Sequence, residues 1–130
     1  MKYFTLILTF LISIQSSFSI NFDQYFINKT LRIDYCFAGN NKKQDVYLNQ
    51  LSQLPEWAGR KSNLSQVLRQ GNGQVKVLDL ESGKCIYIEA FSSLFQEWIT
   101  TPEAKEASRS FENTFLIPFP NKEVLIEVSF

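Results

Sequence analysis

The fold is decided by the stretch Gln74-Val75-Lys76-Val77-Leu78-Asp79-Leu80, Glu81-Ser82-Gly83-Lys84, Cys85-Ile86-Tyr87-Ile88-Glu89-Ala90-Phe91. Two runs rich in β-branched and aromatic residues flank a short polar segment that contains glycine, which is the pattern of a β-hairpin. Apolar side chains recur at every second position, as Val75 and Val77 in the first run and as Ile86, Ile88 and Ala90 in the second. We therefore expect an antiparallel strand pair that buries these two sets of side chains on one face.

Four further segments have strand patterns. Apolar residues alternate strictly over residues 30–37, more weakly over 45–54, and again over 111–119 and 124–130. Pro118 and Pro120 are typical of an edge strand or of its end. A chain of 130 residues supports one hydrophobic core. About six strands with little helix therefore predict a mostly β protein, an antiparallel β-sandwich of immunoglobulin-like or similar type.

One or two short helices are expected beside the strands. Ser62 and Asn63 can cap a helical turn over Leu64, Val67 and Leu68. Thr101, Pro102 and Glu103 form a good helix start, because a hydroxyl can cap free N–H groups and proline suits the first turn. Residues 90–104, which are rich in aromatic side chains, are expected to form a core loop that leads into this second helix.

The composition excludes several function classes. Basic and acidic residues balance at 13 each, so no excess positive charge favours nucleic acid or an anionic membrane. Histidine is absent, which removes the commonest general base and zinc ligand and rules out Ser-His-Asp and Cys-His catalysis. Two carboxylate pairs, Glu103 with Glu106 and Asp79 with Glu81, have acid–base spacing but are typical of solvated surface charge. We expect no enzyme activity and no cofactor in this chain.

The amino end has the pattern of a secretory signal peptide. Met1-Lys2 gives a positive start, residues 3–14 form a mostly apolar run, and small residues follow up to Ser19. Cleavage after Ser19 would leave a domain of residues 20–130. An uncleaved anchor is the alternative, but a span needs about 20 apolar residues and this run is shorter. We expect an exported protein in the periplasm, at the cell surface or outside the cell, with no membrane span after cleavage.

Export bears on the two cysteines, Cys36 and Cys85. An oxidising compartment permits a disulfide between them, provided that their Cα atoms lie within about 7 Å. Two separate buried thiols are the alternative. Cys36, Trp57 and Cys85 also match the order of the immunoglobulin core residues, but Trp57 lies in a Pro/Gly break instead of mid-strand.

The segment Phe95-Gln96-Glu97-Trp98-Ile99-Thr100-Thr101-Pro102-Glu103-Ala104, with Trp57-Ala58-Gly59 and several shorter matches before it, is similar to a known family. It resembles the N-terminal domain of bacterial IgA-peptidase-type zinc metallopeptidases. The resemblance runs in order over nearly all of residues 20–130. It implies a structural role for the residues of the family motif: Trp57, Gly59, Phe95, Glu97, Trp98, Thr101 and Glu103.

In that family a catalytic domain carries a His-Glu-x-x-His zinc signature, which this chain lacks. The resemblance therefore implies zinc only in the catalytic domain. It also implies a C-terminal metallopeptidase domain, covalent or neighbouring, as the partner, and export in Bacteroidetes-like bacteria. The chain stops inside its last strand pattern, which suggests a fragment of a longer polypeptide.

Two functions compete. The first is a non-catalytic accessory domain that supports or orients the secreted metallopeptidase. The alternative is a free-standing secreted binding module for glycan or peptide, with exposed aromatic rings as a stacking platform. Trp57 and Tyr87 are the main candidates for that platform, and Trp98 and Phe95 are further candidates. The alternative requires exposed rings, whereas we expect Trp98 to be buried.

Overall fold

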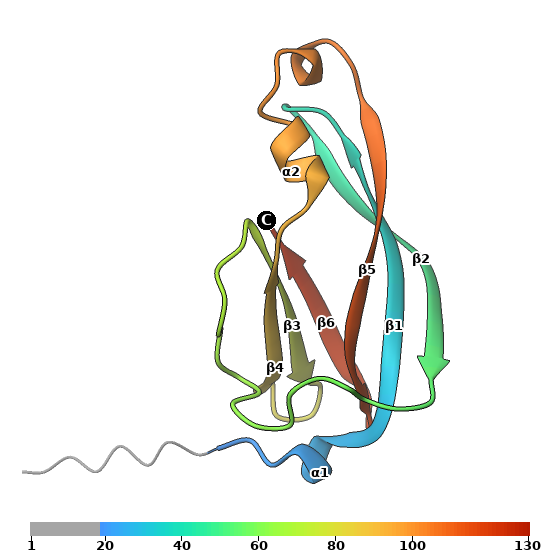
Figure 1. Ribbon diagram of the computed structural model, residues 1–130, viewed down its shortest axis with the longest axis vertical. Helices are drawn as coiled ribbons and strands as arrows, with labels where there is room; N and C mark the ends of the chain where they lie inside the picture. The colour runs from blue at the N-terminus through green and yellow to red at the C-terminus, as the bar shows by residue number, and fades with distance from the viewer. Residues whose placement is uncertain (1–18) are drawn as a thin grey trace, which may run out of the picture.

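The computed structural model describes residues 19–130, which form two antiparallel three-stranded sheets packed face to face (Figure 1). The first sheet has the order β2-β1-β5 and the second the order β4-β3-β6. The strands are β1 (Phe26–Gly39), β2 (Gln44–Leu54), β3 (Gly73–Asp79), β4 (Cys85–Phe91), β5 (Arg109–Pro120) and β6 (Val124–Ser129). The predicted mostly β, antiparallel sandwich is confirmed. The predicted signal peptide lies outside the described residues, apart from Ser19.

Alternating side chains of both sheets form the core. Ile33, Tyr35 and Phe37 of β1 are buried, as are Val75 and Val77 of β3. Aromatic rings join the layers: the ring of Phe37 stacks 6.0 Å from that of Phe91 in the opposite sheet. This burial is the main source of stability, at roughly 1.5–3 kcal/mol for each large apolar side chain.

The predicted hairpin forms, but its buried faces differ from the prediction. Val75 lies opposite Glu89 and Val77 opposite Tyr87, so Tyr87 shares the inner face with the two valines. Ile86, Ile88 and Ala90 therefore project to the other face of β4. Ile86 and Ile88 are nevertheless buried, because the segment between β2 and β3 runs along β4 and its Leu64 carbonyl accepts the Ile88 N–H at 2.9 Å (Figure 1).

The helices also differ from the prediction. No helix forms over residues 62–68, where Asn63 adopts a left-handed conformation (φ 52°) that interrupts helical geometry. The helices of the described residues are α1 (Phe22–Tyr25), α2 (Leu94–Trp98) and the short 3₁₀ helix η1 (Glu103–Lys105). Ser93 caps α2, since its hydroxyl accepts the Gln96 N–H at 3.2 Å. The expected cap at Thr101 is wrong: its hydroxyl donates to the Trp98 carbonyl at 2.7 Å.

The last turn carries the chain from one sheet to the other. β5 is an edge strand of the first sheet, as Pro118 and Pro120 predict, and residues 121–123 lead into β6, which pairs with β3. No helix in residues 19–130 is long and apolar enough to cross a membrane.

Candidate functional site

The predicted aromatic platform of Trp57 and Tyr87 is not available to a ligand. Trp57 is 9 % exposed and Tyr87 2 %, and their rings meet edge to face at 6.0 Å. The Trp57 indole N–H donates to the Arg60 carbonyl at 2.9 Å. The platform prediction is therefore wrong, because these rings fill the core where the segment after β2 closes against β4. Phe95 is fully buried, and Trp98, which we expected to be buried, is half-buried.

Gly59 explains how Trp57 can be buried within a Pro/Gly break. A Cβ atom at position 59 would lie 2.2 Å from Cζ2 of Trp57 and 2.7 Å from its Cε2 and Cη2 atoms. Carbon atoms in contact normally lie about 3.5–4.0 Å apart. The indole therefore packs directly on the glycine backbone, and any larger residue would displace it. This gives a structural reason for the Trp57-Ala58-Gly59 motif.

Arg60 fastens the segment that follows. Its guanidinium donates to the carbonyls of Asn63 and Gln66 at 2.9 and 2.7 Å, and it also donates to the Ile88 carbonyl on β4. The Cζ atom lies 5.2 Å from the centre of the Tyr87 ring, within cation–π range. Burial raises the pKa of Tyr87 to about 12, so the phenol stays neutral beside this cation. The sequence holds no signal for this role, because Arg60 belongs to no recognisable spacing.

The second family motif surrounds α2 and η1. Phe95 packs with Phe37, Trp98 and Phe111 at centroid distances of 5.7, 5.9 and 5.8 Å. The Glu97 side chain is exposed, and the backbone carbonyl of Glu97 accepts a hydrogen bond from the Thr100 hydroxyl at 2.7 Å. Ala104 is buried, and its carbonyl accepts the Asn41 N–H at 3.1 Å, which ties η1 to the β1–β2 turn. The motif thus closes one end of the sandwich.

Glu103 is the polar centre of this motif. Its carboxylate accepts the Trp98 indole N–H at 2.9 Å and the Arg109 Nε–H at 3.1 Å. The hydrogen bond from Trp98, followed by that from Arg109, holds the pKa of Glu103 below its usual value of 4.5. A carboxylate that is stabilised in its charged form is a poor proton donor at neutral pH. The arrangement therefore gives Glu103 a structural task instead of an acid–base partnership with Glu106.

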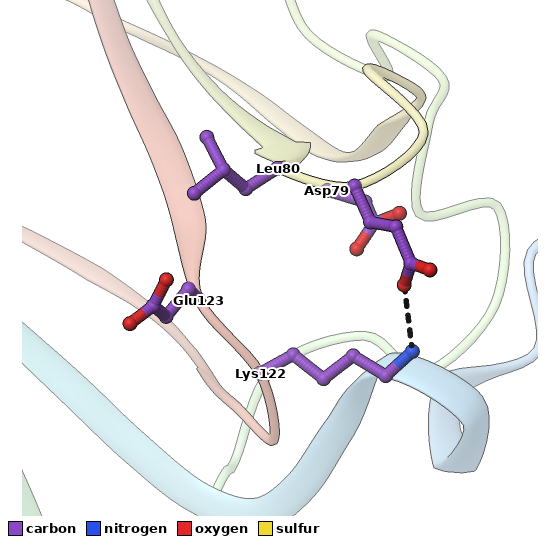
Figure 2. Close-up of a pocket in the computed structure, with 5 residues that line it drawn as sticks. Asp79, Leu80, Lys122 and Glu123 are labelled. Carbon is purple, nitrogen blue, oxygen red and sulfur yellow. Dashed lines mark ion pairs between the residues drawn. The ribbon is translucent and has the colours of Figure 1, made fainter.

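The other carboxylate pair lies at the turn between β3 and β4, beside a shallow hollow lined by Lys122 and Glu123 (Figure 2). Asp79 is 5 % exposed and accepts the Ser82 N–H at 3.0 Å as well as the Ser82 hydroxyl. These bonds, the hydroxyl first, lower the pKa of Asp79. Glu81 points instead to Lys122, with 3.6 Å between Oε2 and Nζ. The two carboxylates thus serve separate partners, and the cluster stabilises a turn.

Metal ligation finds no support in the described part of the chain. Histidine is absent from the sequence, and residues 19–130 contain no group of three Cys, Asp or Glu side chains that could hold a metal ion. These residues do not fit a zinc site of the kind found in a metallopeptidase.

Both cysteines are free. Cys36 lies on β1 between the inward-facing Tyr35 and Phe37, so its side chain projects to the outer face of the first sheet. Cys85 begins β4 in the second sheet, and its thiol contacts the Tyr87 carbonyl at 3.5 Å. The structure thus has two separate thiols in different sheets, which is the alternative to a disulfide.

The comparison with known families bears on the whole domain. The family model described as Peptidase M64 N-terminus matches residues 21–130, which include all six strands and both family motifs. No curated protein matches the chain. The match agrees with the resemblance carried by the motifs around Trp57 and Trp98, and no catalytic domain is evident in the matched residues. The chain belongs to the peptidase M64 N-terminus family.

Proposed function

We propose that this domain is a non-catalytic accessory module of an exported zinc metallopeptidase of the IgA-peptidase type. It supports or orients a catalytic domain, on the same polypeptide or a neighbouring one, that carries the zinc. The family match over residues 21–130 carries this proposal. The motif residues support it, because six of the seven pack, hydrogen-bond or leave room within the fold.

The binding-module alternative is weakened. It required exposed aromatic rings, and three of its four candidates, Trp57, Tyr87 and Phe95, are buried in the described fold, while Trp98 is half-buried and its indole N–H donates to Glu103. No other observation singles out a glycan, so the accessory role remains the better supported function.

The proposal is tested first on the gene. Coding DNA beyond the codon for Phe130, or an adjacent gene, is expected to encode a His-Glu-x-x-His segment, in which the histidines bind zinc and the glutamate is the base. A gene that encodes no such segment downstream, and that has no adjacent gene encoding one, would contradict the proposal. The export part is tested by cell fractionation and intact mass, which are expected to give a mature protein that begins at Ile20.

A further inference from the structure

The inner face of β2 is left uncovered by the opposite sheet. Val46, Leu48 and Leu51 lie opposite Phe37, Tyr35 and Ile33 of β1 and so share their inward direction. These three β2 residues are nevertheless 38 %, 61 % and 53 % exposed. Together with Ile126 and Val128 of β6 they line an apolar groove whose floor includes Tyr35. An apolar sheet face directed toward the core but open to solvent is unusual in a folded domain.

A further feature of this groove is a row of unsatisfied polar groups. β6 is the last strand of its sheet, and no strand of residues 19–130 pairs with its other edge, so that edge presents free N–H and C=O groups. An occupant of the groove must therefore supply backbone hydrogen-bonding groups as well as apolar side chains.

An extended strand meets these requirements together. Added beside β6, it would become the fourth strand of that sheet and cover the inner face of β2. Its backbone would pair with the free edge, and its alternate apolar side chains would contact Leu48 and Leu51.

The size of the groove favours a tethered strand over a second globular copy. At the exposures given above, Val46, Leu48 and Leu51 present on the order of 200 Å² of apolar surface. A stable complex of two separate proteins needs about 800 Å² on each partner. A contact this small holds only a segment that is kept at high local concentration by its connection to the domain. We propose that the groove between β2 and β6 binds an extended, alternately apolar strand of the peptidase polypeptide, an inference that rests on the proposed function.

Hydrogen exchange of the β6 amides tests this directly. In the full-length peptidase, the β6 amides that do not bond to β3 are expected to exchange about 10-fold more slowly than in residues 20–130 alone. Leu48→Asp in the full-length protein is expected to abolish that protection. Leu116→Asp is the matched control, because Leu116 is also well exposed (50 % against 61 % for Leu48) but lies on the outer face of β5, opposite Arg32, so the substitution is expected to leave the protection intact.

The possible failures are distinguishable. Equal exchange of the β6 amides in an active full-length peptidase and in the isolated domain would overturn this inference and leave the proposed function standing. A gene without any peptidase polypeptide would overturn both. A concentration-dependent dimer of residues 20–130 that Leu48→Asp dissociates would assign the groove to a second copy and would also overturn the inference.

Discussion

Gly59→Ala is expected to be among the most destabilising single-methyl changes in this domain. The new Cβ would lie 2.2 Å from the Trp57 ring, so the indole must move by more than about 1 Å to restore normal contact. That movement breaks the 2.9 Å bond to the Arg60 carbonyl and the edge-to-face contact with Tyr87. Overpacking costs about 1–3 kcal/mol and a lost hydrogen bond about 1 kcal/mol, so we expect a loss of about 3 kcal/mol, or about 12 °C in Tm.

The assay is urea unfolding of residues 20–130, monitored by far-UV circular dichroism. Gly83→Ala is the control, because a Cβ there meets nothing within 4 Å and only the left-handed backbone (φ 68°) opposes it, at about 1 kcal/mol. In a Trp57→Leu background, Gly59→Ala is expected to cost less than about 1 kcal/mol, because the ring it would strike is gone. An equal cost in both backgrounds would refute the packing explanation for the motif.

Three further outcomes are expected. Hydrogen bonds hold the pKa of Glu103 below 4.5, so its stabilising contribution is present above that pH and is lost as the pH falls below it. Trp98→Phe removes one of these hydrogen bonds, so the urea midpoint of the variant is expected to fall less steeply than that of the wild type as the pH is lowered below 4.5. An unchanged slope would contradict the role of the Trp98 hydrogen bond in stabilising the Glu103 carboxylate. Arg60→Lys is expected to cost about 2–3 kcal/mol in urea unfolding, because one ammonium cannot reach the same set of carbonyls; a cost within experimental error would disprove its fastening role. Intact mass after alkylation without reductant is expected to show Cys36 and Cys85 both modified, with Cys85 the slower because burial raises the pKa of its thiol; an unmodified pair two mass units lighter would establish a disulfide.

The strands were predictable because alternation with a period of two reports directly on a half-buried sheet. Residues 30–37 alternate strictly, since one face of β1 meets the core and the other meets solvent. The weaker alternation of β2 also has a physical cause, because a register shift in its pairing with β1 leaves Asn49 without a partner, so the inward-facing Leu48 and Leu51 are three positions apart instead of two. Strand position and edge prolines therefore followed from the sequence.

The errors arose where a connecting segment covers a surface. Both faces of β4 are buried, so its alternation could not show that Tyr87, and not Ile86 or Ile88, faces the opposite sheet. The sequence placed Leu64 on the apolar face of a predicted helix. In the structure Leu64 is buried against β4, and it belongs to an irregular segment in which Asn63 has a left-handed conformation. Such contacts depend on tertiary packing, so they produce no hydrophobic periodicity in the local sequence.

The candidate site, like the fold, was predictable from the sequence only in part. The resemblance marked residues such as Gly59 and Glu103, but only the structure shows that Gly59 leaves room for the Trp57 indole and that Glu103 accepts the indole N–H of Trp98. The platform prediction failed because a Pro/Gly break suggests exposure, while here the glycine is what allows Trp57 to be buried. The role of Arg60 could not be predicted, because the carbonyls that its guanidinium binds are brought together only by the fold.

The most direct test of the accessory role is a proteolysis assay on three samples with added zinc: residues 20–130 alone, the full-length peptidase, and the peptidase without these residues. We predict no cleavage by residues 20–130, zinc-dependent cleavage by the full-length protein, and a less stable or less active enzyme once the domain is removed. Zinc-dependent cleavage of a protein substrate by residues 20–130 alone would contradict the account.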